Sequence, residues 1–201
     1  MNSSRTVITA NELIEPGPGD WFISDHHFGH ANIIKHAQRP FSGVAAMNEA
    51  MITQWNAVVG PTDRVIHLGD LYWGADPAQW KAVRQRLNGK ILLVPGNHDP
   101  AQALLDAQVV DAVLPPICEV PYRCKRTGHK RYFVLCHYPL AEWHRMWGGA
   151  IHMHGHTHGS DPAGHPTPPG LRRMDVSADA VGFTPLAPQD IIDRFPSKLV
   201  V

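Results

Sequence analysis

The stretch Met153-His154-Gly155-His156-Thr157-His158 has a histidine at every second position, with a glycine and a threonine between them. In an extended backbone, alternate side chains leave on the same side, so we expect the three imidazoles to converge. Neutral imidazole is the commonest metal ligand among side chains. The alternative is a solvated histidine-rich tract or a purification tag, but a tag is a continuous run at a terminus and this stretch is internal. The stretch therefore predicts a metal site.

Four further segments, all upstream, are short apolar runs that end in side chains able to bind a metal. The runs at residues 21–24, 64–68, 90–94 and 132–136 have the length and composition of buried strands. The side chains that follow them are Asp25 and His27, then Asp70, then Asn97 and His98, and finally His137. Ligands of α/β sheets bind beside the carboxyl ends of the strands, so we expect all five segments to meet there.

Helices are predicted between these strands. A stripe of apolar residues at helical spacing indicates a helix over residues 44–59, which Gly60-Pro61 ends. Asp76 followed by Pro77 is a typical helix start, and residues 101–107 and 188–195 are expected to form two more helices. Further strands are expected at residues 6–8, 112–114, 117–122 and 174–177. The alternation of strand and helix predicts an α/β fold.

The composition limits the functional classes. The chain has 201 residues, with 18 Lys and Arg against 18 Asp and Glu. One domain over residues 1–201 is expected at this length, and the balanced charge favours neither nucleic acid nor an anionic membrane. Three cysteines without a Cys-x-x-Cys pair, and no signal-type or membrane-spanning stretch, predict a cytoplasmic protein. The basic turn at residues 123–131 is interpreted as a solvated hairpin tip, with contact to a polyanion as the alternative.

Taken in order, these motifs resemble those of the calcineurin-like metallophosphoesterase superfamily. They are Asp-x-His at 25–27, Gly-Asp at 69–70, Gly-Asn-His-Asp at 96–99, the lone His137, and Gly-His-Thr-His at 155–158. Residues 175–185 also resemble the closing strand and turn of small prokaryotic and phage members. The resemblance implies a four-layer α/β/β/α sandwich with a dinuclear metal site at the carboxyl ends of the strands.

The resemblance also implies roles for the matching residues. It gives seven metal ligands in two groups that share one carboxylate: Asp25, His27 and His158 for one metal, Asn97, His137 and His156 for the other, and Asp70 bridging both. His98 matches the general acid of the family. His154 falls outside the ligand register, so His154 and His152 are expected either to orient ligand rings or to be polar neighbours.

The residue types support transition metals independently of the resemblance. Four imidazoles with only two carboxylates suit manganese, iron, zinc, cobalt or nickel better than magnesium or calcium, which prefer oxygen ligands. Two divalent cations, two carboxylates and one bound hydroxide leave a net positive charge, which favours an anionic phosphate ester. A pair of such ions can generate hydroxide near neutral pH and stabilise in-line displacement. His98 could then protonate the leaving oxygen.

Residues beside the ligands are assigned from their positions. Asp99 is expected to orient His98, to cap the helix that follows Pro100, or both. Three residues after the first ligands are expected to contact the substrate: His30, Asn32 and Arg39. Three others are expected in the core: His26, His67 and Cys136. Tyr72, Trp73 and Trp147 are expected either to stack on a nucleobase or to pack in the core.

The leading functional hypothesis is a phosphoesterase that cleaves phosphodiesters or nucleotides by in-line attack of a hydroxide bridging two metals. Protein Ser/Thr phosphatases of the superfamily carry an acid and an arginine soon after Gly-Asp, where this chain has Leu71-Tyr72-Trp73-Gly74. Their third motif ends in glutamate, and here it ends in Asp99. One alternative is a phosphomonoesterase of small molecules. The other is a non-catalytic scaffold, as in a retromer subunit of this fold that lacks the acid histidine. Nucleic acid stays open as a partner.

Overall fold

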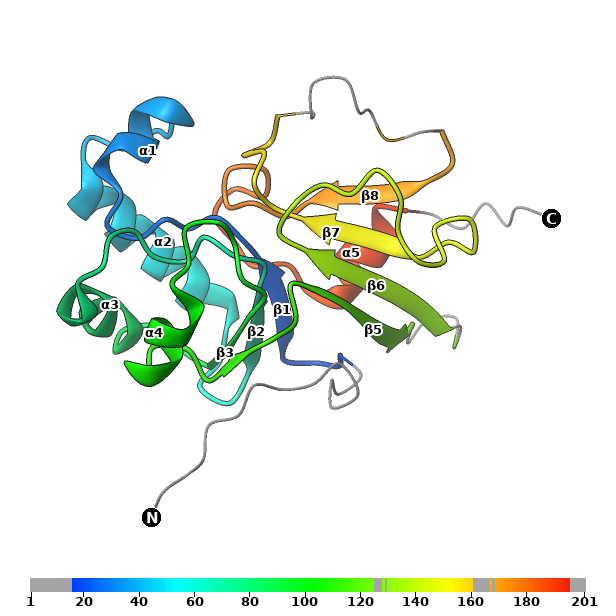
Figure 1. The fold of residues 1–201 in the computed structure, drawn as a ribbon, viewed down its shortest axis with the longest axis horizontal. Coiled ribbons are helices and arrows are strands. Elements are labelled where there is room, and N and C mark those ends of the chain that lie inside the picture. The colour runs from blue at the N-terminus through cyan, green and yellow to red at the C-terminus, as the bar shows by residue number, and fades with distance from the viewer. Residues whose placement is uncertain (1–15, 125–127, 129, 161–166, 168, 196–201) are drawn as a thin grey trace, which may run out of the picture.

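The first sheet is parallel throughout, and its register aligns the ends of its strands (Figure 1). The order is β1 (Asp20–Ile23), β2 (Arg64–His67), β3 (Lys90–Leu93) and β4 (Ala112–Val113). Ile23 pairs with His67, and His67 pairs with Leu93, so the last residues of β1, β2 and β3 are neighbours. The loops that carry the first three predicted motifs therefore start side by side.

The computed structural model describes residues 16–124, 128, 130–160, 167 and 169–195. The strand expected at residues 6–8 and the centre of the basic turn lie outside these residues. The other expected strands and helices are present, with ends shifted by a few residues. None of the described helices is long and apolar enough to cross a lipid bilayer.

Helices cover one face of the first sheet. α2 (Val44–Val58), α3 (Pro77–Arg84) and α4 (Ala101–Asp106) lie where the sequence predicts them. The Asp76 side chain accepts a hydrogen bond of 2.9 Å from the amide of Ala78 and so caps α3. The sequence does not predict α1 (Ala31–His36), because this helix is short, has no capping side chain and buries only Ile33.

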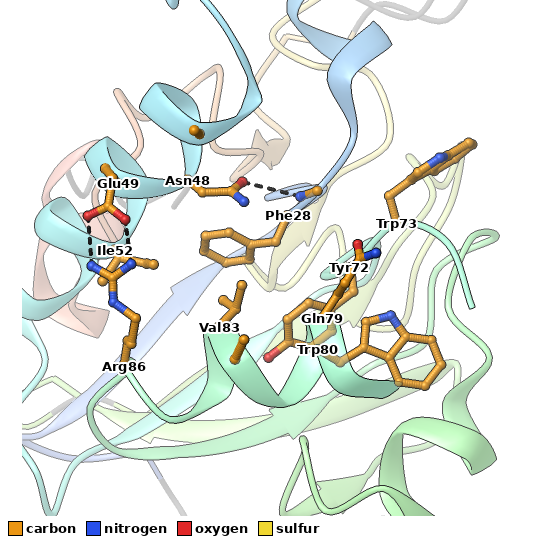
Figure 2. A pocket seen from close by; sticks show the side chains of 13 residues that line it. Phe28, Asn48, Glu49, Ile52, Tyr72, Trp73, Gln79, Trp80, Val83 and Arg86 are labelled. Atoms are coloured by element: carbon orange, nitrogen blue, oxygen red, sulfur yellow. Dashed lines mark hydrogen bonds and ion pairs between the residues drawn. The ribbon is translucent and has the colours of Figure 1, made fainter. Parts of the chain in front are cut away.

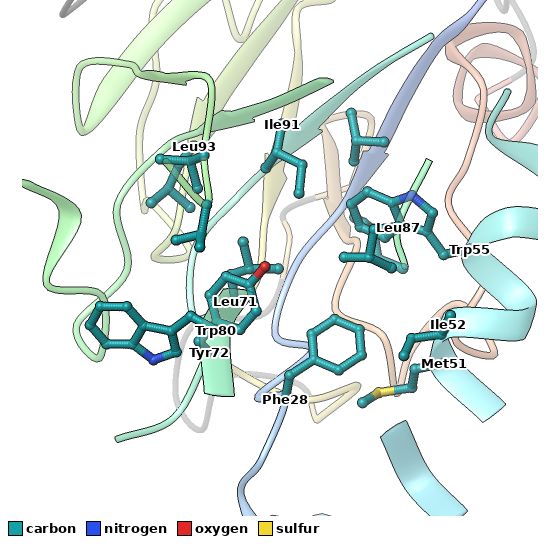
Figure 3. Packing of buried hydrophobic residues seen from close by; sticks show 14 of the residues in the cluster. Phe28, Met51, Ile52, Trp55, Leu71, Tyr72, Trp80, Leu87, Ile91 and Leu93 are labelled. Carbon is teal, nitrogen blue, oxygen red and sulfur yellow. The ribbon is translucent and has the colours of Figure 1, made fainter. Parts of the chain in front are cut away.

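A hydrophobic cluster fills the space between these helices and the first sheet (Figure 3). Trp55 of α2 is fully buried there, and its indole N–H donates a hydrogen bond of 2.9 Å to the carbonyl of Asn88. Phe28 directly follows the motif residue His27, and Leu71 directly follows Asp70. Both also belong to this cluster. The loops that carry the motifs are thus anchored in the core on one side.

The second sheet is mixed. It has the order β5 (Ile117–Arg123), β6 (Lys130–Cys136), β7 (Ile151–His154) and β8 (Arg172–Asp175). β5 is antiparallel to β6, whereas β6, β7 and β8 are parallel to one another. The carboxyl ends of β6, β7 and β8 therefore lie at one edge, as those of the first sheet do.

The two sheets pack face to face through a second hydrophobic cluster. Phe22 and Ile66 of the first sheet belong to it, together with Phe133, Leu135 and Met153 of the second. The Phe22 and Phe133 rings meet edge to face, with centroids 5.6 Å apart. Backbone hydrogen bonds also join the sheets at the motif edge, since the amide of Ser24 donates to Val176.

The outer face of the second sheet differs from the expected fourth layer. Val134 points to this face and packs with Trp143 and Leu171, which lie in loops. α5 (Pro188–Asp193) instead buries Ile191 and Ile192 in the cluster between the sheets. The described residues therefore form three of the four expected layers, and loops replace the second helix layer.

Candidate metal centre

The predicted motifs converge at the shared edge of the two sheets. Asp25 and His27 follow β1, Asp70 follows β2, Asn97 and His98 follow β3, His137 follows β6, and His156 and His158 follow β7. Two overlapping groups of these residues bring their ligand atoms close enough to hold a metal ion. The groups are Asp25 with His27 and His158, and Asp25 with Asp70 and His137.

The backbone at this edge adopts left-handed conformations that residues other than glycine rarely use. Nine described residues other than glycine have positive φ, and five of them are the expected ligands Asp25, His27, Asp70, His156 and His158, with φ between 50° and 69°. Each such residue costs on the order of 1–3 kcal/mol, and strain of this kind is concentrated at functional sites. The left-handed backbone conformation turns the chain sharply after the end of each strand and so sets the direction of each of these side chains.

Glycines allow the loops to approach the carboxylates. A Cβ at Gly155 would collide with the Asp25 carboxylate and the Ser24 hydroxyl, and a Cβ at Gly96 would collide with the Asp70 carboxylate. Gly69, at φ +94°, lies against the backbone of Gly96. The glycines of three predicted motifs are thus required by close packing.

Asp25, His27 and His158 have the separations of ligands around one cation. The Asp25 Oδ1 lies 3.8 Å from the Nε2 of His27 and 3.7 Å from the Nε2 of His158. These distances are too long for hydrogen bonds, whereas ligands about 2.1 Å from a tetrahedral metal lie roughly 3.4 Å apart. The His27 ring is buried, and neither of its nitrogens has a hydrogen-bond partner among the residues that the structure describes. A cation at this point would satisfy Nε2, so the donor set fits a metal.

The Asp70 side chain lies between His27 on one side and His137 on the other. Its Oδ2 is 3.6 Å from the Nε2 of His27 and 3.5 Å from the Nε2 of His137. Its Oδ1 accepts a hydrogen bond of 2.9 Å from the amide of His98. The Oδ1 of Asp70 is therefore held by the backbone, and its Oδ2 faces both His27 and His137.

The remaining expected ligands surround His137. The Nδ1 of His137 donates a hydrogen bond to the carbonyl of Leu68 at 2.8 Å, which leaves Nε2 directed to Asp70. The Oδ1 of Asn97 lies 3.0 Å from this Nε2, and the His156 ring centroid lies 5.2 Å from that of His137. His98 is more exposed, with its Nε2 4.0 Å from the Oδ2 of Asp70.

The three histidines of the opening motif do not converge as an extended chain would require. β7 ends at His154, and the left-handed backbone at His156 and His158 turns these two side chains toward His137 and His27. His154 is buried and faces His152 at 5.5 Å. His152 is satisfied within the second sheet, since its Nδ1 donates to Val134 and its Nε2 accepts from Leu140. Both are therefore polar neighbours.

Burial controls protonation at the centre. Burial raises the pKa of Asp25 to about 8, although the charge of His158 lowers it in part. Burial also raises the pKa of Asp70. For the imidazoles, burial lowers the pKa of His27 to about 2 and that of His137 to about 4. These two rings are neutral at pH 7, which is the form that binds metals, and a cation would relieve the buried carboxylates.

Asp179 holds His158 in place, and sequence reasoning missed it. Its Oδ2 accepts a hydrogen bond of 2.6 Å from the Nδ1 of His158, so the Nε2 of that ring is left for a metal. Burial lowers the pKa of His158, but the hydrogen bond to Asp179 and the charges of Asp25 and Asp179 outweigh it and raise the pKa. Asp179 follows β8, so the rule that found the other residues at strand ends could also have found it.

The prediction that Arg39 contacts the substrate is wrong. Its side chain is buried and stabilises the loops that carry the metal centre. Its side chain is fully buried and forms a bidentate ion pair with Asp179, with both hydrogen bonds at 2.8 Å. It also donates to the backbone carbonyls of Asp25 and His26. A substrate cannot reach this guanidinium, which instead joins the β1 loop to the β8 loop.

The Asp99 side chain also binds backbone groups of the loops around the centre. Its carboxylate accepts hydrogen bonds from the amides of Asp70 at 2.6 Å, Gly96 at 2.9 Å and Leu71 at 3.0 Å. The N-cap of α4 is Pro100, so the interpretation of Asp99 as the helix cap is wrong. Through these three bonds Asp99 fixes the β2 loop against the β3 loop.

The other residues beside the ligands divide between core and surface. His26 and His67 are fully buried and are joined by a hydrogen bond of 2.9 Å, and Cys136 is also buried, as expected. His30 stacks in parallel on Trp73 with centroids 3.6 Å apart, while Asn32 is exposed on α1. Contact of His30 and Asn32 with a substrate stays a prediction.

A cavity of about 350 Å³ lies between α2 and α3 (Figure 2). Phe28, Tyr72 and Val83 line it, and the bidentate ion pair between Glu49 and Arg86 lies at its rim. Tyr72 is buried here, so of its two expected roles the structure gives it packing.

Replacing Gly155 by alanine is expected to weaken binding of Mn²⁺ by about 10- to 100-fold, because the new Cβ displaces the Asp25 carboxylate. Isothermal titration calorimetry with the metal-free protein measures the affinity. Gly43→Ala is the matched control, since no atom of the described residues lies within 4 Å of a Cβ there. Equal affinities of the two variants would contradict the close packing.

Replacing Asp179 by asparagine is expected to lower the affinity for Mn²⁺ by about 10- to 100-fold, because a neutral amide orients the His158 ring less strongly. Asp106→Asn, on the exposed surface of α4, makes the same chemical change away from the centre. If both variants bind Mn²⁺ as the unmodified protein does, Asp179 does not position His158.

Metal binding is expected to strengthen as the pH rises toward 8. Below its raised pKa of about 8, Asp25 holds a proton that a cation must displace. For one displaced proton, the affinity changes by about tenfold per pH unit and levels off above the pKa. Calorimetric titrations in buffers of different ionisation enthalpy count the released protons. An affinity for Mn²⁺ that is constant from pH 6 to pH 8 would contradict the raised pKa.

No protein-family model matches the chain. The uncharacterized protein MJ1445 of Methanocaldococcus jannaschii is 33% identical over 180 residues, which are 89% of this chain and 91% of that protein. The gene 66 protein of Mycobacterium phage D29 is 30% identical over 190 residues, covering 85% of this chain and 92% of that protein.

A third relative is the glycerophosphodiester phosphodiesterase GpdQ of Enterobacter lignolyticus, 32% identical over 99 residues that make up 48% of this chain and 32% of that enzyme. The crystal structure of AQ665, a protein of unknown function from Aquifex aeolicus, matches with a TM-score of 0.66 and 22% identity, over 88% of this chain and 98% of that one. This last likeness concerns the fold alone. Together with the clusters of histidine and aspartate, the sequence relatives show that the chain belongs to the calcineurin-like metallophosphoesterase superfamily.

Proposed function

We propose that this protein hydrolyses phosphate esters with two divalent transition-metal ions, drawn from manganese, iron, zinc, cobalt and nickel. Asp25, His27 and His158 would hold one ion, Asn97, His137 and His156 would hold the other, and Asp70 would be a ligand of both. The observation that carries the proposal is the position of the Asp70 Oδ2, 3.6 Å from the Nε2 of His27 and 3.5 Å from that of His137. A single carboxylate oxygen between two imidazole nitrogens suits a ligand common to two ions.

Bound ions of this kind supply Lewis acidity and a nucleophile at neutral pH. The side chains of the chain provide orientation and a proton. Asp179 and the Leu68 carbonyl fix the rings of His158 and His137 so that each offers Nε2. His98 has an exposed ring beside Asp70, from which it can donate a proton to the leaving oxygen of an ester.

Two observations favour phosphodiesters or nucleotides as substrates. The similar protein GpdQ is named a glycerophosphodiester phosphodiesterase, although only part of it matches. The centre also opens to solvent at Asn97, His98 and His156, which are exposed, so a phosphate that carries two substituents can reach it. The neutral amide of Asn97, in place of a third carboxylate, keeps the loaded site positive for an anionic ester.

The proposed enzyme is one metallophosphoesterase domain over residues 1–201 that acts in the cytoplasm. The buried thiols Cys118 and Cys136 suit a reducing compartment. Its partners in this proposal are small phosphoesters, with single-stranded nucleic acid as a further substrate to be tested.

The test is a panel of the five metals on metal-free protein with bis(p-nitrophenyl) phosphate and p-nitrophenyl phosphate. We expect metal-dependent turnover with a preference for the diester. A preference for the monoester would make the protein a phosphomonoesterase, and no turnover with any metal, on a protein that binds none, would favour a scaffold.

Replacing His98 by glutamine is expected to lower turnover by about 10²–10⁴-fold while metal binding is kept, because the general acid is lost. His144→Gln, at an exposed histidine whose ring contacts Glu119, is the matched control. Unchanged turnover of the His98 variant would reject its assigned role.

A further inference from the structure

Two exposed aromatic rings stand beside the metal centre. Only four large hydrophobic side chains are exposed among the residues that the structure describes: Trp73, Ile117, Tyr138 and Trp147. Trp73 follows Asp70 by three residues, and Tyr138 directly follows His137. Exposed aromatic rings next to a site are contacts available to a ligand.

Trp73 is held in a fixed orientation although it is 38% exposed. One face of the indole is stacked on His30, with an interplanar angle of 3°. Its amide donates a hydrogen bond of 2.9 Å to the carbonyl of Phe28, which ties its loop to the β1 loop. Trp73 is one of the residues that line the cavity between α2 and α3, and Figure 2 shows its indole directed away from Phe28 and Val83.

The Trp73 ring lies on the side of the centre where His98 would release the leaving group. Its centroid is 4.9 Å from that of His98 and 6.4 Å from that of His27. A ring attached to the leaving oxygen would therefore emerge beside the indole. His30 gains a role as the support of Trp73 in this arrangement.

Tyr138 lies beside His137 and His156, the expected ligands on the other side of Asp70. Its centroid is 5.0 Å from that of His137 and 4.8 Å from that of His156, and both contacts are made edge to face. The ring is 44% exposed. A substituent on the second ester oxygen of a diester would meet this ring.

We propose that Trp73 and Tyr138 form a binding site for planar rings on the two ester oxygens of a phosphodiester, with Trp73 on the leaving-group side. The proposal rests on the proposed hydrolysis and adds the substrate class, which is aryl or nucleoside diesters. Stacking on an aromatic side chain changes affinity by roughly 5- to 100-fold per ring.

Binding is tested with diphenyl phosphate and dimethyl phosphate, titrated into Mn²⁺-loaded protein by calorimetry. We expect the unmodified protein to prefer the diphenyl ester by about tenfold or more. Trp73→Ala and Tyr138→Ala should each reduce this preference, whereas Trp73→Phe and Tyr138→Phe should retain it. Trp147→Ala, at an indole that is 78% exposed, is the control for a general aromatic effect.

Turnover then assigns the two rings. With methyl p-nitrophenyl phosphate, whose only ring is on the leaving group, Trp73→Ala should raise KM by about tenfold, the effect of one stacked ring, and should raise it more than Tyr138→Ala does. With bis(p-nitrophenyl) phosphate, both variants should raise it. The p-nitrophenyl ester of thymidine 5′-phosphate tests whether the second ring can be that of a nucleoside. For this ester, Tyr138→Ala should raise KM more than for the methyl ester.

The ring-binding proposal is overturned if the unmodified protein shows no preference for the diphenyl ester, or if either alanine variant keeps that preference. These results are separate from the failure of hydrolysis itself. Turnover of bis(p-nitrophenyl) phosphate by a protein without the ring preference would leave a phosphoesterase standing and remove only its aromatic site.

Discussion

The carboxylates of Asp25 and Asp70 are buried where the two sheets meet, and the surrounding loops are built around them. Each accepts a backbone hydrogen bond from a distant segment, Asp25 from the amide of His156 and Asp70 from that of His98. A buried carboxylate is costly unless hydrogen bonds or cations compensate it. The glycines at 96 and 155 are needed because a side chain there would occupy the space of these oxygens.

Much of the centre could be predicted from sequence because metal chemistry restricts the residue types. Aspartate, asparagine and histidine at the ends of apolar runs indicated the edge where they meet, and the structure brings these side chains together at that edge. The runs themselves were visible because a parallel sheet buried on both faces has nearly continuous apolar strands. Their chain order was also enough to suggest the superfamily, which the relatives then showed.

The supporting residues could not be predicted as well, because their roles depend on distances that one chain does not reveal. Arg39 and Asp179 are 140 residues apart and meet under the centre as an ion pair. Asp99 looks like a helix cap beside Pro100, yet its carboxylate accepts hydrogen bonds from the amides of Asp70 and Leu71 in the β2 loop and from that of Gly96 in its own loop. The alternation expected for the histidine motif failed because β7 ends at His154 and the backbone then becomes left-handed. The outer helix layer that the described residues lack is a related case, since apolar loop residues such as Trp143 can cover a sheet without helical periodicity.

The proposed ligands are divided between the two sheets, and this division has a consequence for assembly of the protein. Asp25, His27 and Asp70 come from the first sheet, and His137 and His158 from the second. In the proposed site neither sheet supplies the complete donor set, so a nascent chain that has formed only its N-terminal sheet would bind a cation less tightly than the folded protein. An ion bound there would contact side chains of both sheets and would link them. Metal binding at the proposed site would therefore also stabilise the interface between the two sheets.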